Sequence, residues 1–216
     1  MFKAIIFDMD GVLIDSVKHI WESFNILLKN EEVHFSDNYI KKNLSRPLKD
    51  NLKAWKQEYG IKEYDPIDFS KKSARIQLKL LKNEKPSKDL LNLLKQCKEQ
   101  EIKCAVGTSS LRWRAEKILN LLKIRKFFDA IVTAEDTKNH KPDPDVFLEA
   151  TRQIRVKPEE CVVIEDAVDG VKAAKRGNMK AIGFITKYNS AKEFKHADIT
   201  INDFSEINIE KLKKLF

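Results

Sequence analysis

The spacing of apolar residues changes character twice along this chain. Between residues 16 and 83, apolar positions recur with helical periodicity, and no segment alternates between apolar and polar residues as a half-buried strand does. Outside this region, short apolar runs end in turn residues and are separated by further stretches of helical spacing. The pattern predicts a bundle of helices inserted into a chain that otherwise alternates between strands and helices.

Cap residues, prolines and glycines set the ends of the expected elements. In the insert they predict helices at 16–29, from Ser36 through Leu44, from Pro47 to Gly60, and at 65–82. Elsewhere, apolar runs predict strands at 4–7, 103–107, 130–133, 161–164, 180–184 and 198–201, with helical spacing between them and a closing helix at 209–216. This alternation implies right-handed crossovers and a Rossmann-like parallel sheet, so we expect an α/β core of residues 1–15 and 84–216 and a helical domain of residues 16–83.

Composition agrees with a folded chain. The 216 residues are 42% hydrophobic and 34% charged, which is ordinary for a globular protein with a large core. The net charge is +8, but the lysines alternate with acidic residues and form no block of five or more. We interpret this as a solvated, lysine-rich surface and expect no nucleic-acid partner, because no nucleic-acid-binding module accompanies the charge. Nucleic-acid binding is the minor alternative.

Cysteine usage and hydropathy are typical of a cytoplasmic protein. Cys97, Cys104 and Cys161 form no CxxC pair and leave an odd count, which favours reduced thiols over a disulfide framework or a metal site. No stretch approaches the length of a membrane span, and the amino terminus lacks the basic and apolar regions of a signal peptide. We therefore expect a cytoplasmic location and no membrane association.

Polar side chains follow several of the expected strands. Asp8 and Asp10 come directly after the first apolar run, and Gly11 then lets the chain turn. Open α/β sheets bind their ligands at the carboxyl ends of the strands, and carboxylates this close repel each other unless a cation or a shared proton separates them. Further polar groups follow in chain order: Thr108 and Ser109 after the second strand, Lys141 before a helix start, and Glu165 and Asp166 at the end of the strand at 161–164.

In this order, strand–Asp-x-Asp-Gly, strand–Thr/Ser, Lys-Pro and strand–Glu-Asp-x-x-x-Gly resemble the four motifs of the haloacid dehalogenase-like superfamily. The likeness covers the whole chain and is strongest to the phosphatase and β-phosphoglucomutase-like branch. It implies that residues 16–83 form a helical cap domain that closes over the active site. It also implies a Mg²⁺-dependent phosphatase acting on a small phosphorylated metabolite, such as a sugar phosphate or a phosphoglycolate-like compound.

The resemblance implies roles for the acidic residues. Asp8 would be the nucleophile that forms an aspartyl-phosphate, and Asp10 would protonate the leaving oxygen and then activate water. Asp8 and Asp166 end strands that would be neighbours in this fold, and they provide the two carboxylates that Mg²⁺ commonly uses. In the family, the backbone carbonyl of Asp10 is the third protein ligand. Glu165 is expected to help orient waters on the metal.

Three further residues are candidates for binding the phosphate. Thr108 supplies a hydroxyl, and the amides at Ser109 and beyond open a helix, where anions bind readily. Lys141 supplies the positive charge that a phosphate dianion needs. Two simpler interpretations stay open, with Thr108 as a helix cap and Lys141 as a surface lysine.

Residues of the insert bear on the substrate. Arg46 lies in Asn43-Leu44-Ser45-Arg46-Pro47, where related mutases and some phosphatases place a substrate-binding arginine; a solvent-exposed arginine at a helix start is the alternative. The mutase branch has a histidine where this chain has Ile20, and His19 lies about 100° away around a helix. A phosphatase is therefore favoured, with a sugar-phosphate mutase as the alternative. A catalytically silent binding protein is disfavoured, because every catalytic position is intact.

Overall fold

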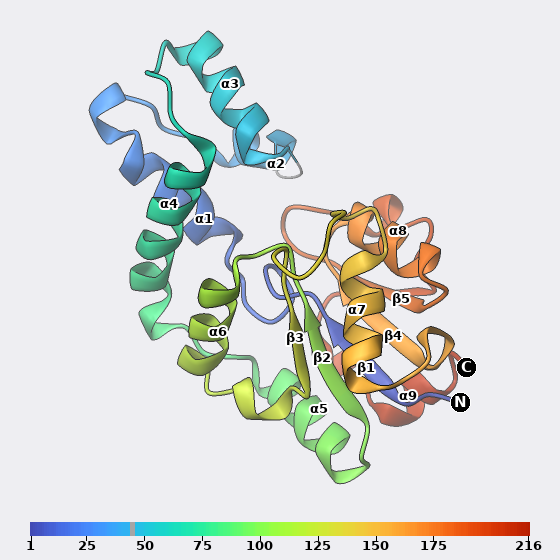
Figure 1. Ribbon diagram of the computed structural model, residues 1–216. Helices are drawn as coiled ribbons and strands as arrows, with labels where there is room; N and C mark the ends of the chain where they lie inside the picture. Colours follow the sequence, from blue (N-terminus) through green and yellow to red (C-terminus); the bar gives the residue numbers. More distant parts are fainter. Residues whose placement is uncertain (44–45) are drawn as a thin grey trace. The chain divides into compact units, whose positions relative to one another are not determined.

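The computed structural model describes residues 1–43 and 46–216 and divides into two compact units (Figure 1). The first unit consists of Met1–Asp15 and Glu84–Phe216, and the second of Ser16–Asn83. All three cysteines are buried and free. In the described part of the chain, no helix is both long enough and apolar enough to cross a membrane.

The second unit is helical. Its helices are α1 (Val17–Leu27), α2 (Asp37–Asn43), α3 (Leu48–Tyr59) and α4 (Pro66–Leu80), with 3₁₀ turns η1 (Lys29–Glu31) and η2 (Leu81–Asn83). Asp65 caps α4 by accepting a hydrogen bond of 2.7 Å from the Asp68 N–H, and Gly60 ends α3 with φ +68°. The first helix is shorter than expected, because the chain passes into η1 after Leu28. Leu44, expected at the end of the second helix, lies outside the described residues.

Aromatic rings and a small polar network hold these helices together. Trp21 of α1 and Trp55 of α3 meet edge to face with ring centroids 6.0 Å apart, and both side chains are buried. Between α1 and α4, the Ser23 and Ser73 hydroxyls lie 2.6 Å apart, and Gln77 Nε2 donates to Ser73 Oγ at 2.7 Å. Because these buried polar atoms are paired, they fix how α1 meets α4 instead of weakening the packing.

The first unit is built on a six-stranded parallel sheet in the order β3-β2-β1-β4-β5-β6. The strands are β1 (Ala4–Phe7), β2 (Lys103–Gly107), β3 (Ala130–Val132), β4 (Cys161–Glu165), β5 (Lys180–Phe184) and β6 (Ile199–Ile201). The expectation of an α/β protein with a Rossmann-like parallel sheet is confirmed. β3 ends one residue earlier than expected, because the Thr133 N–H and hydroxyl both donate to Asp136 at 2.7 Å and start a turn.

Helices cover both faces of the sheet. They are α5 (Lys88–Glu99), α6 (Arg112–Leu121), α7 (Asp145–Ile154), α8 (Val168–Arg176) and α9 (Ile209–Lys213), with 3₁₀ turns η3 (Arg125–Phe127), η4 (Pro158–Glu160), η5 (Ala191–Glu193) and η6 (Phe204–Glu206). α7 packs on β2 and β3, and α8 on β4 and β5 (Figure 1). Ile6 faces that core, whereas Phe7 points to the other side and meets Phe128 and Phe204, as alternation along a strand requires.

The register of the central strands brings three loops to one edge of the sheet. Phe7, the last residue of β1, pairs with Val106 of β2 on one side and with Ile164 of β4 on the other. All residues of β1 are fully buried, so the strand is fixed on both faces. The residues that follow these strands therefore emerge side by side at the carboxyl edge, where α/β sheets bind ligands.

Candidate active site

Asp8 lies at the centre of this edge. Its backbone N–H donates to the Ile164 carbonyl at 2.9 Å, which continues the pairing of β1 with β4 by one residue. Only 6% of the residue is exposed. Gly11 then adopts φ +86°, and its N–H donates to the Ile14 carbonyl at 2.8 Å, so the chain turns away directly after the acidic pair. Asp8 is thus a carboxylate held at the end of the most buried strand.

Lys141 connects the ends of three strands. Its Nζ donates to Asp8 Oδ1, to Glu165 Oε1 at 2.7 Å and to the Gly107 carbonyl at 3.2 Å. These contacts use all three hydrogens of the ammonium group. The Lys141 side chain is 9% exposed and lies over the Phe147 ring, 4.7 Å from its centroid. Lys141 is therefore a buried partner of Asp8 and not a surface lysine, while its contact with a phosphate stays a prediction.

Burial and like charge shift the acid–base equilibria here. Burial raises the pKa of Asp8 to about 7, with Lys141 opposing the shift and Glu165 adding to it. Burial, followed by the charges of Glu165 and Asp8, raises the pKa of Asp166 well above its usual value. Burial alone would lower the pKa of Lys141, but the charges of Asp8 and Glu165 raise it. At Asp8 and Asp166, burial and neighbouring carboxylates therefore outweigh the positive charge of Lys141.

Asp166 follows β4 and lies against the turn after β1. Asn189 Nδ2 donates to the Asp166 backbone carbonyl at 2.7 Å and fixes this loop. A Cβ at Gly11 would lie 2.0 Å from Asp166 Oδ2, so only glycine leaves room for the carboxylate. Among the residues that the structure describes, the Asp166 carboxylate has no hydrogen-bond donor. Its oxygens are available to a ligand.

Glu165, the last residue of β4, differs from Asp166 in that both of its carboxylate oxygens accept hydrogen bonds from the protein. It is 1% exposed; one carboxylate oxygen accepts from Lys141 and the other from the Ala167 N–H at 2.6 Å. A Cβ at Gly170 would lie 1.9 Å from Glu165 Oε1, so this glycine also makes room for a carboxylate. Both Glu165 oxygens therefore have protein partners. An effect of Glu165 on metal-bound water stays a prediction.

The hydroxyl motif forms a turn between β2 and α6. Thr108 is 1% exposed; its N–H donates to the Val132 carbonyl at 2.9 Å, and its Oγ1 accepts from the Ser110 N–H at 3.1 Å. Ser109, between them, is exposed. α6 begins only at Arg112, so Thr108 shapes the turn and does not cap the helix. Phosphate binding by Thr108 and Ser109 stays a prediction.

Arg114 also belongs to this edge, although no motif in the sequence contains it. Its two terminal nitrogens each donate to one carboxylate oxygen of Asp10, both at 2.7 Å, and Nη1 also donates to Ser110 Oγ at 2.8 Å. One feature of the sequence indicates a partner for Arg114. This residue lies in the first turn of α6, where the helix dipole disfavours a positive charge unless an anionic group lies nearby. Helical spacing alone does not identify that partner.

The balance of charge fits a divalent cation. Asp8 and Glu165 both pair with Lys141, and Asp10 pairs with Arg114, while the nearby Asp166 carboxylate adds negative charge to the same edge. No group of three or more His, Cys, Asp or Glu side chains in the described chain is arranged to hold a metal unaided. Mg²⁺ usually takes one or two carboxylates and keeps several waters, so Asp8 and Asp166 provide suitable ligand types, and a Mg²⁺ site with the Asp10 carbonyl stays a prediction.

Arg46, the candidate in the insert, and Asp169, at the start of α8, are both exposed. Arg46 belongs to the second unit and is exposed, and its backbone carbonyl accepts from Asn51 Nδ2 at 3.1 Å. Leu44 and Ser45 of the same motif lie outside the described residues. Asp169 is exposed in the first turn of α8 and pairs with Lys172 at 3.1 Å. This surface position is what helix-dipole compensation requires.

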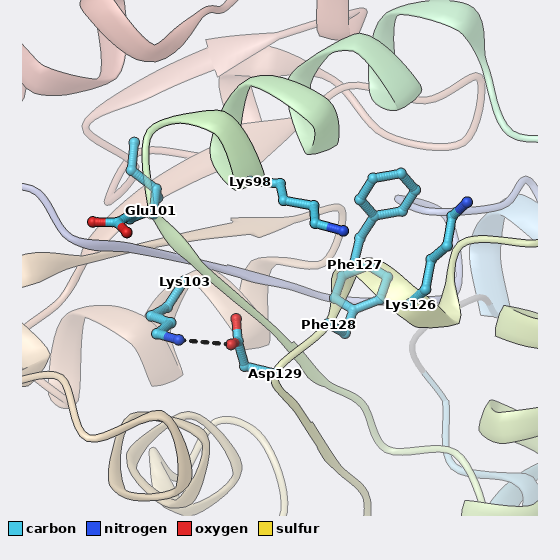
Figure 2. Close-up of a pocket in the computed structure, with 8 residues that line it drawn as sticks. Lys98, Glu101, Lys103, Lys126, Phe127, Phe128 and Asp129 are labelled. Carbon is cyan, nitrogen blue, oxygen red and sulfur yellow. Dashed lines mark hydrogen bonds and ion pairs between the residues drawn. The ribbon is translucent and has the colours of Figure 1, made fainter.

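Two hollows lie at the opposite edge of the sheet, before β2 and β3 begin. Figure 2 shows one of them, of about 540 Å³, lined by Lys98, Glu101, Ile102, Lys103, Lys126, Phe127, Phe128 and Asp129. The dashed contact in it is the Lys103–Asp129 ion pair of 2.9 Å. The second hollow, of about 720 Å³, shares Glu101, Ile102, Lys103 and Asp129 with the first. Neither is lined by Asp8 or its partners, so the candidate site is the carboxyl edge.

Comparison with known proteins gives matches along nearly the whole chain. A family model described as haloacid dehalogenase-like hydrolase matches residues 5–184, a range that contains Asp8, Asp10, Thr108, Ser109, Lys141, Glu165 and Asp166. The chain is 30% identical to a phosphorylated carbohydrates phosphatase of Thermotoga maritima, over 88% of each chain. It is 31% identical to a β-phosphoglucomutase of Bacillus subtilis, over 97% of this chain and 93% of the relative. The crystal structure of β-phosphoglucomutase from Clostridium difficile has the same fold, with a TM-score of 0.84 and 23% identity over 100% of this chain and 97% of that one.

Proposed function

This chain belongs to the haloacid dehalogenase-like hydrolases and is a phosphoric monoester hydrolase, and we propose that it is a Mg²⁺-dependent phosphatase that works through an aspartyl-phosphate on Asp8. The observation that carries this proposal is the buried Asp8 carboxylate, held by Lys141 between the ends of β1, β2 and β4. The substrate class we propose is a small phosphorylated metabolite. The two curated relatives act on such compounds according to their names, which supports this class.

The proposed chemistry has two halves. An Asp8 carboxylate oxygen attacks phosphorus; the bond from phosphorus to the ester oxygen breaks, and its electron pair leaves with that oxygen, which takes a proton from Asp10. A water oxygen then attacks phosphorus, Asp10 takes a proton from that water, and the bond from phosphorus to Asp8 breaks. Inorganic phosphate leaves, and both aspartates return to their starting forms.

Positive charge decides whether a carboxylate can attack a phosphate dianion at all. Lys141 supplies one charge beside Asp8, and the backbone N–H of the exposed Ser109 would donate to a phosphate oxygen, whereas the N–H groups of Thr108 and Ser110 already donate within the protein. Mg²⁺ held by Asp8, Asp166 and the Asp10 carbonyl would supply two more charges. Asn189 fixes the loop that carries Asp166, and Gly11 leaves space for its carboxylate. The chain thus provides both the nucleophile and the means to neutralise its target.

Excess chelator is expected to abolish turnover, and added Mg²⁺ to restore it, because the carboxylates at this edge otherwise lack balancing charge. Ca²⁺ should restore it poorly, since its coordination is longer and more variable. The measurement is phosphate release from a broad panel of phosphorylated metabolites, with chelator and with each cation in turn. Full activity in metal-free buffer would contradict the proposal that Asp166 is a Mg²⁺ ligand.

The second candidate function is a sugar-phosphate mutase, which the 31% identity to a β-phosphoglucomutase favours. A mutase returns the phosphoryl group from Asp8 to a sugar hydroxyl, and that branch couples substrate binding to this step through the histidine that Ile20 replaces. With Ile20 there, we expect β-glucose 1-phosphate, if accepted, to give phosphate and glucose without a bisphosphate activator. Phosphorus NMR follows both products. Stoichiometric glucose 6-phosphate with little inorganic phosphate would select the mutase instead.

We further propose that Arg46 contacts the part of the substrate remote from the reacting phosphate. Arg46→Ala should lower kcat/KM for the best metabolite by a factor that corresponds to about 1.5–3 kcal/mol, the usual worth of a hydrogen bond to a charged group. An aryl phosphate without a second anionic group should be hydrolysed at nearly the wild-type rate. Steady-state kinetics on both substrates make the comparison. Unchanged values for both would identify Arg46 as an arginine in solvent.

A further inference from the structure

Asp10 is held by a different cation from the one that holds Asp8. Arg114 Nη1 donates to Asp10 Oδ2 and Nη2 to Asp10 Oδ1, both at 2.7 Å. Two parallel hydrogen bonds from a planar guanidinium fix the plane of a carboxylate as well as its position, which the point charge of a lysine cannot do. The Arg114 side chain is 6% exposed and that of Asp10 is 24% exposed. The pair is therefore largely shielded from water.

The same guanidinium is tied to the turn after β2. Arg114 Nη1 also donates to Ser110 Oγ at 2.8 Å, and the Ser110 N–H donates to Thr108 Oγ1. Arg114 thus links the loop after β1, which carries Asp10, to the turn proposed to receive the phosphate. A cation in the first turn of α6 opposes the helix dipole, and the Asp10 carboxylate offsets that cost. The proposed reaction steps involve Asp8 and Asp10 and assign no role to Arg114.

We propose that Arg114 is a positioning residue that holds the Asp10 carboxylate beside the phosphate-binding turn, so that proton transfer to and from the substrate depends on it. The inference rests on the proposed phosphatase function. Asp10 has to protonate the leaving oxygen as a carboxylic acid and then take a proton from water as a carboxylate, and both transfers need the group at hydrogen-bonding distance from the reacting oxygen. Without the guanidinium, the Asp10 carboxylate loses the two hydrogen bonds that fix its plane. Arg114 acts through Asp10 and touches no reacting atom.

Substrates with different leaving groups isolate this role. Formation of the aspartyl-phosphate, which kcat/KM reports, needs a proton on the leaving oxygen of an alkyl phosphate, whereas para-nitrophenolate leaves without one. For Arg114→Met we expect kcat/KM to fall at least about tenfold for the best alkyl phosphate and to stay within about twofold for para-nitrophenyl phosphate. Hydrolysis of the aspartyl-phosphate also uses Asp10, so a burst of nitrophenol should precede a slower steady state.

Two further variants make the experiment decisive. Arg112→Met removes another arginine from the same turn of α6, one that pairs with Asp136 and the Ile131 carbonyl, and it should keep the wild-type ratio of the two kcat/KM values. Arg114→Lys keeps the charge but cannot make the paired contact, so its ratio should lie between those of wild type and Arg114→Met. If Arg114→Met does not fold, Arg114→Lys carries the test.

Each outcome decides between the two proposals. If wild type hydrolyses neither substrate, the phosphatase function fails and this inference falls with it. If wild type hydrolyses both and a folded Arg114 variant keeps the wild-type ratio without a burst, the phosphatase stands and the positioning role is wrong. The role is also wrong if both substrates lose kcat/KM equally with raised KM, because Arg114 would then only support the turn.

Discussion

Asp8→Asn is expected to remove nearly all turnover while the protein stays folded. The amide keeps the shape of the carboxylate but cannot attack phosphorus, and it takes one charge from the proposed Mg²⁺ site. We expect kcat to fall more than about 1000-fold, or about 4 kcal/mol of activation free energy. Steady-state phosphate release measures the effect. A folded variant that kept more than about a tenth of the wild-type rate, a loss of less than about 1.4 kcal/mol, would contradict nucleophilic catalysis by Asp8.

The stability of this variant follows from the raised pKa of Asp8. The pKa is about 7 in the folded protein against 3.8 ordinarily, so between these values the folded protein binds a proton that the unfolded chain has released. The free energy of unfolding therefore falls as pH rises through this window. Asparagine has no such dependence. Asp8→Asn should melt at or above the wild-type temperature at pH values above about 7 in chelator. Asp68→Asn, at an exposed ion pair with Lys72, is the matched control for activity and should keep the wild-type rate.

Lys141→Ala is expected to lose both activity and stability. Removing this ammonium group leaves Asp8 and Glu165 buried without their cation, which typically costs about 3–5 kcal/mol of unfolding free energy. Without Lys141 the pKa of Asp8 rises further, so the loss should be largest above neutral pH and shrink as the carboxyl groups protonate at lower pH. We also expect kcat/KM to fall at least about tenfold, because the nucleophile loses a charged hydrogen-bond partner.

Chemical denaturation across pH, together with phosphate release, tests this second expectation. Lys138→Ala is the control, because Lys138 is exposed in the segment that precedes Lys141. It should change neither the free energy of unfolding nor the rate. If Lys141→Ala were as stable as wild type above neutral pH, the ion pairs of Lys141 with Asp8 and Glu165 would not support the fold. If it kept wild-type kcat/KM, Lys141 would have no part in the reaction.

Much of the fold is predictable because its signals are local. The strands expected at 103–107 and 180–184 have these bounds in the structure, since each is an apolar run closed by a turn. Asp65 caps its helix as a short polar residue before proline should. The bounds that shifted involve competing contacts: Thr133 leaves β3 because its N–H and hydroxyl bind Asp136. Periodicity carries no information about that contact.

The site likewise contains residues that local motifs predict and one pair that they do not. Asp8, Glu165 and Lys141 come from motifs at strand ends or helix starts, and the structure brings their charged groups together. The Arg114–Asp10 pair was not predicted because its members are 104 residues apart in sequence and meet only when the first turn of α6 approaches the loop after β1. The spacing of residues within a short motif cannot reveal a pair so far apart in the chain. The folding of the whole unit creates it, and it gives Asp10, the proposed acid–base residue, a partner that no motif contains.

Direct detection of the phosphoryl group on Asp8 tests the central claim most closely. The Asp10→Asn variant should form the aspartyl-phosphate from para-nitrophenyl phosphate but hydrolyse it slowly, because it lacks the base that activates water. Acid quenching, proteolysis and fragment-ion mass spectrometry then locate the phosphoryl group within the amino-terminal peptide. We expect it on Asp8, and none in an Asp8→Asn/Asp10→Asn double variant. A phosphoryl group on any other residue, or nitrophenol release with no phosphorylated peptide at any time, would contradict the account.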